Sequence, residues 1–408
     1  MYKPLVISRS YLWDRSTTGQ IQRVFWEYLC ERGIEPTIIC SDRDTHTVPI
    51  DSIKCKLIPT RDSKWIRFIV KTIGNSIAPD LLLSPDDAWY TWGKVSAIKR
   101  AIQEADSGRY DYIQSANHPV TSHLIALKAK QKTGLPWIAY IYDPWANNPF
   151  RNFKSISCYN RDLRWESSVA ENADAILHIS QPVFNDWVKR YGEGIRKKMF
   201  MLPTVFDVKK ADARSGVSKR DTSKFVISHI GALYEIRNSV DFLLALHLLL
   251  EEHPELKKRV VLNYVGSVTD EDRKYVSKLK LECVTNFVGF ISEEDCKQYY
   301  ESSDLFLSID AKSSQNIFFP SKIMKYFYYG KPILGLTPKN SALQSELSKS
   351  NNFYFSNEDY HGIAKFLYYA ITNPDFSDGI DKEYWRNFTM ERICPRYIDI
   401  VTQVFQKK

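Results

Sequence analysis

Short apolar runs rich in β-branched residues alternate with longer segments of helical period along most of the chain. This alternation is typical of parallel β-sheets that are covered by helices on both faces. In the first half, the runs expected to form strands are 5–8, 37–40, 53–58, 112–115, 137–142 and 175–180. The pattern predicts an α/β fold with doubly wound parallel sheets.

A polar stretch without apolar periodicity interrupts the alternation at 208–224. Such composition is typical of interdomain linkers, so we expect one domain over 1–207 and a second over 225–379. In the second domain the expected strands are 225–230, 260–265, 284–288, 305–309 and 332–336. Residues 380–408 carry apolar residues at helical spacing and are expected to form helices that cross back to the first domain. Two Rossmann-like sheets would then face a central cleft beyond the carboxyl ends of their strands.

The composition narrows the class of protein. Hydrophobic residues make up 44% and charged residues 25% of the 408 residues, which is typical of a globular protein and not of a disordered or fibrous one. With 56 Lys and Arg against 48 Asp and Glu, the formal net charge of +8 favours an anionic partner. Seven cysteines without C-x-x-C spacing predict neither a disulfide framework nor a zinc site and suit the reducing cytoplasm. The sequence shows neither a signal peptide nor an 18-residue apolar run.

Two turns in the second domain have the features of a diphosphate site. Gly231 ends an expected strand and Arg237 precedes an expected helix, so backbone amides and a guanidinium would meet an anion there. The alternative is an ordinary tight turn with an exposed arginine. Further on, Pro320 and Ser321 open an expected helix with Lys322 in its first turn. Ser321 would cap this helix and offer its hydroxyl to the donor. A cation there opposes the helix dipole by about 0.3–1 kcal/mol unless an anion lies nearby, so Lys322 indicates anion binding.

These segments carry a family resemblance. The run 320–332, Pro-Ser-Lys followed by Tyr-Phe-Tyr-Tyr-Gly-Lys-Pro, resembles the nucleotide-sugar-binding signature of retaining GT-B glycosyltransferases, specifically glycosyltransferase family four. The segment 231–238 is similar to the family's phosphate-binding loop. The segment 287–292 resembles its base-recognition loop, which implies that Val288 and Gly289 flank the base. The resemblance covers nearly the whole chain and implies a GT-B architecture whose second domain binds the donor.

The sequence departs from the family pattern at two positions that usually hold glutamates. Counting back from Gly330, these positions hold Ile317 and Lys325. Loss of the first glutamate is common among relatives of the Pro-Ser-Lys type. In resembling enzymes the second glutamate accepts hydrogen bonds from the ribose hydroxyls, whereas a lysine can only donate, to a ribose oxygen or to a phosphate. We expect Lys325 at the donor, and the exchange leaves open whether catalysis is weakened or abolished.

The resemblance also implies residues on the acceptor side of the first domain. Gly19 would let the backbone approach the phosphates; alternatively, its loop merely caps a helix through Ser16. Asn117 and His118 end an expected strand. His118 would hydrogen-bond the transferred sugar, unless it is a structural histidine. Asp143 ends another strand and either lines the cleft or starts a turn.

No metal and no other cofactor is expected. Two Asp-x-Asp strings, at 42–44 and 270–272, are of the kind that binds the metal of the other major glycosyltransferase fold. Such strings also arise by chance, and the second suits the first turn of a helix. We expect Arg237, Lys322 and helix N-termini to stabilise the leaving diphosphate instead. The chain lacks the motifs of P-loop NTPases, dinucleotide-dependent dehydrogenases and α/β-hydrolases.

The segment 64–73 interleaves cations with bulky apolar residues, among them Trp65 and Phe68. At helical spacing it predicts a short basic amphipathic helix that can lie against anionic lipids. The alternative is a helix with its apolar side in the core and its basic side in water.

The resemblance implies a metal-independent, retaining hexosyltransferase in polysaccharide, O-antigen or capsule assembly. Its partners would be a nucleotide-diphosphate-sugar donor, a glycan or lipid-linked oligosaccharide acceptor and an anionic membrane, but no nucleic acid. We expect it in the cytoplasm, at the inner face of the cell membrane. One alternative, motivated by Ile317 and Lys325, is a non-catalytic partner of a glycan-assembly complex. The other is a nucleotide-sugar epimerase or hydrolase, which would need acid–base groups across the donor site.

Overall fold

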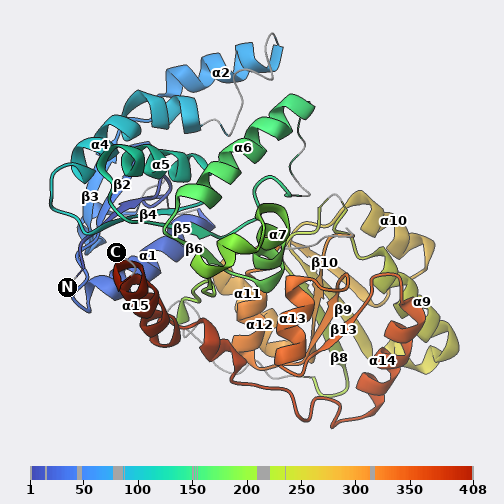
Figure 1. Ribbon diagram of the computed structural model, residues 1–408. Coiled ribbons are helices and arrows are strands. Elements are labelled where there is room, and N and C mark those ends of the chain that lie inside the picture. Colours follow the sequence, from blue (N-terminus) through green and yellow to red (C-terminus); the bar gives the residue numbers. More distant parts are fainter. Residues whose placement is uncertain are drawn as a thin grey trace. The chain divides into compact units, whose positions relative to one another are not determined.

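The chain divides into two compact units, which are described separately. A computed structural model describes residues 2–13, 16–43, 48–76, 86, 88–148, 151, 153, 155–208, 221–234, 236–312 and 318–406. The first unit comprises 1–207 together with 388–408, and the second comprises 208–387 (Figure 1). Most of the predicted linker, 209–220, lies outside the described residues.

The first unit contains a seven-stranded sheet of order β3-β2-β1-β4-β5-β6-β7, and every strand pair in it is parallel. The strands are β1 Pro4–Ile7, β2 Thr37–Ser41, β3 Lys56–Thr60, β4 Tyr112–Ala116, β5 Trp137–Ile141, β6 Ala175–His178 and β7 Met199–Met201. The expected strand at 53–58 is displaced to 56–60, and the short edge strand β7 was not predicted. Because the order reverses between β1 and β4, the carboxyl ends beside this switch point are where a ligand site is expected.

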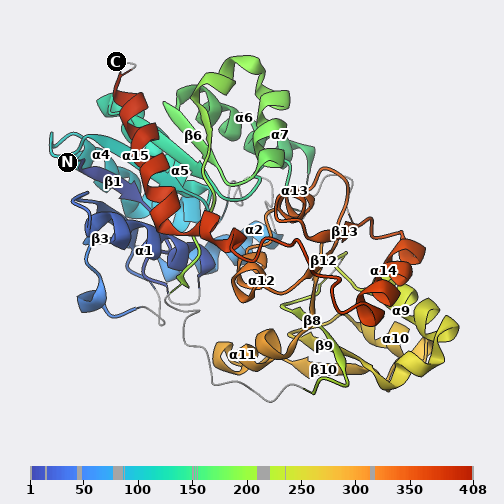
Figure 2. The ribbon, with the colours of Figure 1, turned by 90° about the horizontal axis from the view of Figure 1, so that it is seen from below.

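Helices cover both faces of this sheet. They are α1 Thr17–Cys30, α2 Lys64–Ser76, α4 Ile98–Ala105, α5 Thr121–Thr133, α6 Ile156–Asn172, α7 Gln181–Tyr191 and α15 Met390–Gln406. Figures 1 and 2 show α1 and α15 on one face and α4 and α5 on the other. The fully buried Tyr397 of α15 packs edge-on against Phe25, with ring centroids 4.9 Å apart, and its hydroxyl lies 2.7 Å from that of Tyr112. The C-terminal helix is thus part of the first unit's core.

The second unit contains a six-stranded parallel sheet of order β10-β9-β8-β11-β12-β13. Its strands are β8 Phe225–Ile230, β9 Val260–Val265, β10 Thr285–Gly289, β11 Leu305–Ile309, β12 Ile333–Leu336 and β13 Phe353–Phe355. Its helices are α9 Val240–Glu252, α10 Asp270–Lys278, α11 Glu293–Ser302, α12 Ile323–Tyr329, α13 Ala342–Lys349 and α14 Tyr360–Thr372. Both views place α9, α10 and α14 on one face and α11, α12 and α13 on the other. The prediction of two doubly wound parallel sheets is confirmed.

The second Asp-x-Asp string is part of the fold of this unit. Thr269 caps α10 by accepting a hydrogen bond from the Asp272 amide. The fully buried Asp272 carboxylate accepts four hydrogen bonds of 2.6–2.8 Å, from the amides and hydroxyls of Ser239 and Thr269. Asp272 therefore ties the start of α9 to the start of α10, whereas Asp270 is exposed.

Replacement of Asp272 is expected to destabilise the second unit strongly. In Asp272→Ala the buried donors of Ser239 and Thr269 lose their acceptor, so we expect unfolding to cost about 3 kcal/mol less. Asp270→Ala removes only an exposed carboxylate at a helix start and should change stability by less than about 1 kcal/mol. Denaturant unfolding of both variants measures the difference. Equal losses would mean that Asp272 does not link the two helices.

Candidate donor-binding site

A glycine of positive φ lies at the carboxyl end of each of β8, β9 and β10, directly after the first two strands and as the last residue of the third. The angles are 135° at Gly231, 123° at Gly266 and 78° at Gly289. Backbone hydrogen bonds join the loops: the Gly231 amide donates to Val265 (2.7 Å) and the Gly266 amide donates to the Gly289 carbonyl (2.8 Å). A Cβ atom at position 266 would lie 2.4 Å from the Gly231 carbonyl oxygen, so only glycine fits there.

This geometry corrects the expected role of Gly231. Its amide is already bound within the sheet, so this glycine contributes space and not a hydrogen-bond donor. The space lies beside Lys322, because a Cβ atom at position 231 would be 3.2 Å from Lys322 Cδ and 3.4 Å from its Nζ. The strand end of β8 and the loop before α12, distant in sequence, therefore meet at one point.

Lys322 is held by a histidine that the sequence analysis missed. Its Nζ lies 3.0 Å from Nε2 of His229, a fully buried residue of β8. The other ring nitrogen, Nδ1, lies 3.0 Å from the Leu307 carbonyl oxygen, which can only accept. Nδ1 therefore carries the proton, and Nε2 accepts a hydrogen bond from Lys322. Burial, and then the Lys322 charge, hold the pKa of His229 well below its usual value, so the ring is neutral.

Two cations converge at this strand end. Burial and the neighbouring Arg237 guanidinium lower the pKa of Lys322 to about 7, and the Asp310 carboxylate opposes them in part. Arg237 stacks over the ring of Tyr234, with its Cζ 5.2 Å from the ring centroid. Asp310 follows β11 and accepts a hydrogen bond of 2.7 Å from the Thr337 hydroxyl. An anion bound here would relieve the repulsion between Lys322 and Arg237, which is the chemistry that a diphosphate supplies.

The helix after this loop differs from the prediction. It begins at Ile323, and Lys322 occupies the cap position without a side-chain cap. The Ile323 amide donates to the Pro320 carbonyl (2.9 Å), so residues 320–323 form a turn, and the expected Ser321 cap is wrong. Ser321 is exposed. The expected end of the helix at Gly330 is confirmed by its left-handed φ of 62°.

The other predicted donor residues lie in α12 and at the end of β10. Lys325 forms an ion pair with Glu293, at the start of α11. Val288 and Gly289 end β10, and the next residue, Phe290, is 95% exposed. Ile317 lies outside the described residues. The sequence analysis missed His229 and Asp310, although a polar residue in or just after an apolar strand was the available signal for both.

In the first unit, the structure brings together three of the predicted acceptor-side residues. Asn117 Nδ2 donates to the Asp143 carbonyl (3.0 Å), and Asn117 Oδ1 accepts from the Tyr142 amide (2.7 Å). His118 Nε2 lies 3.3 Å from Asp143 Oδ2, and both side chains are partly exposed, at 45% and 33%. A partly exposed histidine and carboxylate thus lie together after β4 and β5, where they can hydrogen-bond a ligand.

Gly19 does not join this group. It lies in the first turn of α1, where its amide donates to the capping hydroxyl of Ser16 (3.1 Å). A Cβ atom at position 19 would lie 2.2 Å from the Ser10 carbonyl oxygen. The glycine is therefore required by close backbone packing, and the capping alternative describes this segment correctly.

Comparison with known proteins finds one matching family model and several structures with a similar fold. Residues 25–210 match the model of Glycosyltransferase Family 4. The fold of the whole chain is similar to sucrose-phosphate synthase from Thermosynechococcus elongatus, at 14% identity and a TM-score of 0.69, with 100% of each chain covered. It is also similar to HepE from Anabaena in complex with UDP and glucose, at 14% identity and a TM-score of 0.65, covering 98% of this chain and 100% of that one.

A third similar structure is the lipopolysaccharide outer core galactosyltransferase WaaB, at 12% identity and a TM-score of 0.65, with 99% of each chain covered. No curated protein matches the sequence significantly. At these identities the similar structures show the fold, which is that of GT-B glycosyltransferases. Over residues 25–210 the family match confirms the resemblance to family four. The similar structures show that the whole chain has the GT-B fold.

Proposed function

We propose that this protein is a retaining hexosyltransferase that moves a sugar from a nucleotide-diphosphate-sugar to an acceptor hydroxyl. The observation that carries the proposal is the Lys322 side chain beside Gly231, at the carboxyl end of β8, where the Arg237 charge contributes to lowering the Lys322 pKa. In this proposal both cations neutralise the diphosphate as its charge develops. The similar HepE structures contain UDP with glucose, or UDP-glucose, which supports a donor of this class.

Each group has a distinct task in the proposed reaction. Lys322 and Arg237 bind the diphosphate, and His229 holds the Lys322 ammonium in place through Nε2. His118 and Asp143 form a hydrogen-bonding pair for a sugar. The bond from the sugar to the diphosphate breaks, the bond from the sugar to the acceptor oxygen forms, and the acceptor proton passes to the leaving phosphate. Retention needs no side-chain nucleophile in this scheme.

The acceptor that we propose is a glycan or lipid-linked oligosaccharide in polysaccharide, O-antigen or capsule assembly. The similarity to WaaB, a lipopolysaccharide galactosyltransferase, supports this class. Such acceptors are presented at a membrane, so we place the protein in the cytoplasm, in peripheral contact with the inner face of the cell membrane.

Thermal-shift measurements with a panel of nucleoside diphosphates and their sugars test donor binding. Ligand at about 100 times its Kd is expected to stabilise the protein by about 2.7 kcal/mol. Absence of stabilisation by every nucleotide would contradict donor binding and favour the non-catalytic partner. Mass analysis of the products, with and without lipid-linked acceptors, separates transfer from epimerisation or hydrolysis, since only transfer needs an acceptor.

We also propose that the reaction needs no metal ion, because Lys322 and Arg237 supply the charge that a metal would supply. Transfer should therefore continue at an unchanged rate in excess EDTA. As the control, Mg²⁺ or Mn²⁺ is added back after chelation, and the rate should stay within about twofold of the rate in EDTA. Loss of one charge-stabilising group would change the rate far more. A rate that collapses in EDTA and recovers with metal would contradict this.

A further inference from the structure

Helix α2 presents bulky apolar side chains to solvent. Trp65 is 70% and Phe68 62% exposed, and their rings stack with centroids 6.0 Å apart. The helix is anchored on its other side by Val70, which is buried. Val70 faces the core, as the alternative of a core-facing helix predicts. Trp65 and Phe68 face solvent, so that alternative is wrong for these two residues.

Cations share the exposed face of α2. Lys64 and Lys71 are exposed, and their positions, seven residues apart, flank Phe68 at helical spacing. The helix sequence contains three cations and no acidic residue. Aromatic side chains and lysines on one exposed helical face are the combination that suits the interface of an anionic bilayer, where rings enter the headgroup layer and lysines meet phosphates.

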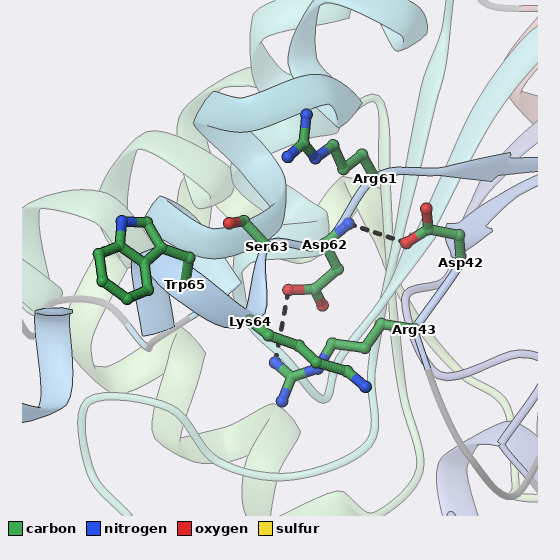
Figure 3. A pocket seen from close by; sticks show the side chains of 7 residues that line it. All are labelled: Asp42, Arg43, Arg61, Asp62, Ser63, Lys64 and Trp65. Atoms are coloured by element: carbon green, nitrogen blue, oxygen red, sulfur yellow. Dashed lines mark hydrogen bonds and ion pairs between the residues drawn. The ribbon is translucent and has the colours of Figure 1, made fainter. Parts of the chain in front are cut away.

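A cavity at the start of α2 extends the positive surface. It has a volume of about 420 Å³ and is lined by Asp42, Arg43, Arg61, Asp62, Ser63, Lys64 and Trp65 (Figure 3). Of its two carboxylates, Asp62 is buried against Arg9, with an N···O distance of 2.6 Å, and Asp42 accepts from the Asp62 amide (2.9 Å). Both carboxylates thus have partners in the protein, while Arg61 and Lys64 are exposed.

We propose that the exposed face of α2 (Lys64, Trp65, Phe68 and Lys71), together with Arg61, is a docking surface for an anionic phospholipid bilayer. The occupant is identified by charge complementarity, because the face is cationic and aromatic throughout. None of the helices in the described ranges has the length and hydropathy to span a bilayer, so the contact is a surface one. The inference rests on the proposed function, but vesicle binding is measured without sugar transfer, so the docking surface and the transferase activity can fail separately.

Co-sedimentation with vesicles tests the surface. The full chain should bind vesicles of phosphatidylcholine mixed with phosphatidylglycerol, and bind phosphatidylcholine alone at least about tenfold more weakly. The double variant Trp65→Ala/Phe68→Ala should lose at least about tenfold in partitioning to the mixed vesicles. Lys64→Gln and Lys71→Gln should each bind the mixed vesicles roughly fivefold more weakly than the unchanged protein. At high salt this difference should disappear, because the salt screens the attraction between lysines and phosphates.

A matched control is Ile50→Ala/Tyr369→Ala, which removes two apolar side chains that are 57% and 49% exposed elsewhere. It should bind vesicles as the unchanged protein does, and all variants should keep the thermal shift with UDP-glucose. Equal binding of both double variants, or no preference for anionic vesicles, would overturn the proposal. So would light scattering that shows a dimer disrupted by Trp65→Ala/Phe68→Ala, because the face would then be covered by a second copy.

Discussion

Lys322→Met is expected to reduce sugar transfer by about 10²–10³-fold, the cost of losing one preorganised charge at a developing anion. The methionine keeps the length of the side chain and its packing beside Gly231 but cannot donate or carry charge. His229 Nε2 then loses the partner that lies 3.0 Å away. Lys339→Met, at an exposed lysine of the same unit, is the control and should transfer normally.

The pH dependence of donor binding distinguishes this role of Lys322 from a purely structural one. In the free protein the pKa of Lys322 is lowered to about 7, so above pH 7 the amine is increasingly neutral. A bound diphosphate favours the ammonium and raises that pKa, so binding above pH 7 takes up a proton. The Kd for UDP-glucose should therefore be flat below pH 7 and rise up to about tenfold per pH unit above it.

UDP-glucose suits this titration because its diphosphate, esterified at both ends, does not change charge in this range. Lys322→Arg keeps the charge at all these pH values, so binding should persist without the slope. Lys322→Met should bind weakly at every pH. A slope above pH 7 that survives in Lys322→Arg would show that another group titrates.

How much of the fold could be predicted from the sequence depends on the length of each apolar run. Strands β8, β9 and β11 have the predicted bounds, because β11 is buried throughout and β8 and β9 are each buried except for one half-buried valine. Strands β7 and β13 were missed, since three residues at a sheet edge carry too little periodicity. The shift of β3 has a different cause. Pro59 led to a predicted end at residue 58, but β3 is an edge strand, which tolerates a proline, and it continues to Thr60.

The site was less predictable, because its key contacts join distant segments. The chemical character of Gly231 and Lys322 was visible in the sequence, and the structure places them together. His229 was not found, since its partner lies 93 residues further along the chain. At Gly19, the contact with the Ser10 carbonyl depends on how the chain folds back before α1, which no local pattern reports. The orientation of Trp65 and Phe68 was likewise undecided, because an amphipathic period does not say which face meets the core.

Arg237→Ala should reduce transfer by about 100-fold or more and leave the fold intact, because the turn that carries Arg237 is held by its backbone. The Arg237 amide donates to the Tyr234 carbonyl (2.9 Å) and the Tyr234 amide donates to the Arg237 carbonyl (3.0 Å), so both bonds survive the substitution. Arg386→Ala, which removes an exposed arginine of the same unit that stacks on Trp385, is the matched control and should transfer normally.

The same variant should change the titration of Lys322 in a direction that a loss of stability would not produce. The Arg237 charge lowers the pKa of Lys322, so its removal raises that pKa. In Arg237→Ala the Kd for UDP-glucose should be higher at low pH, but its rise should begin at a pH above 7. An unchanged onset near pH 7, measured by calorimetry across the pH range, would mean that Arg237 and Lys322 do not share one anion site.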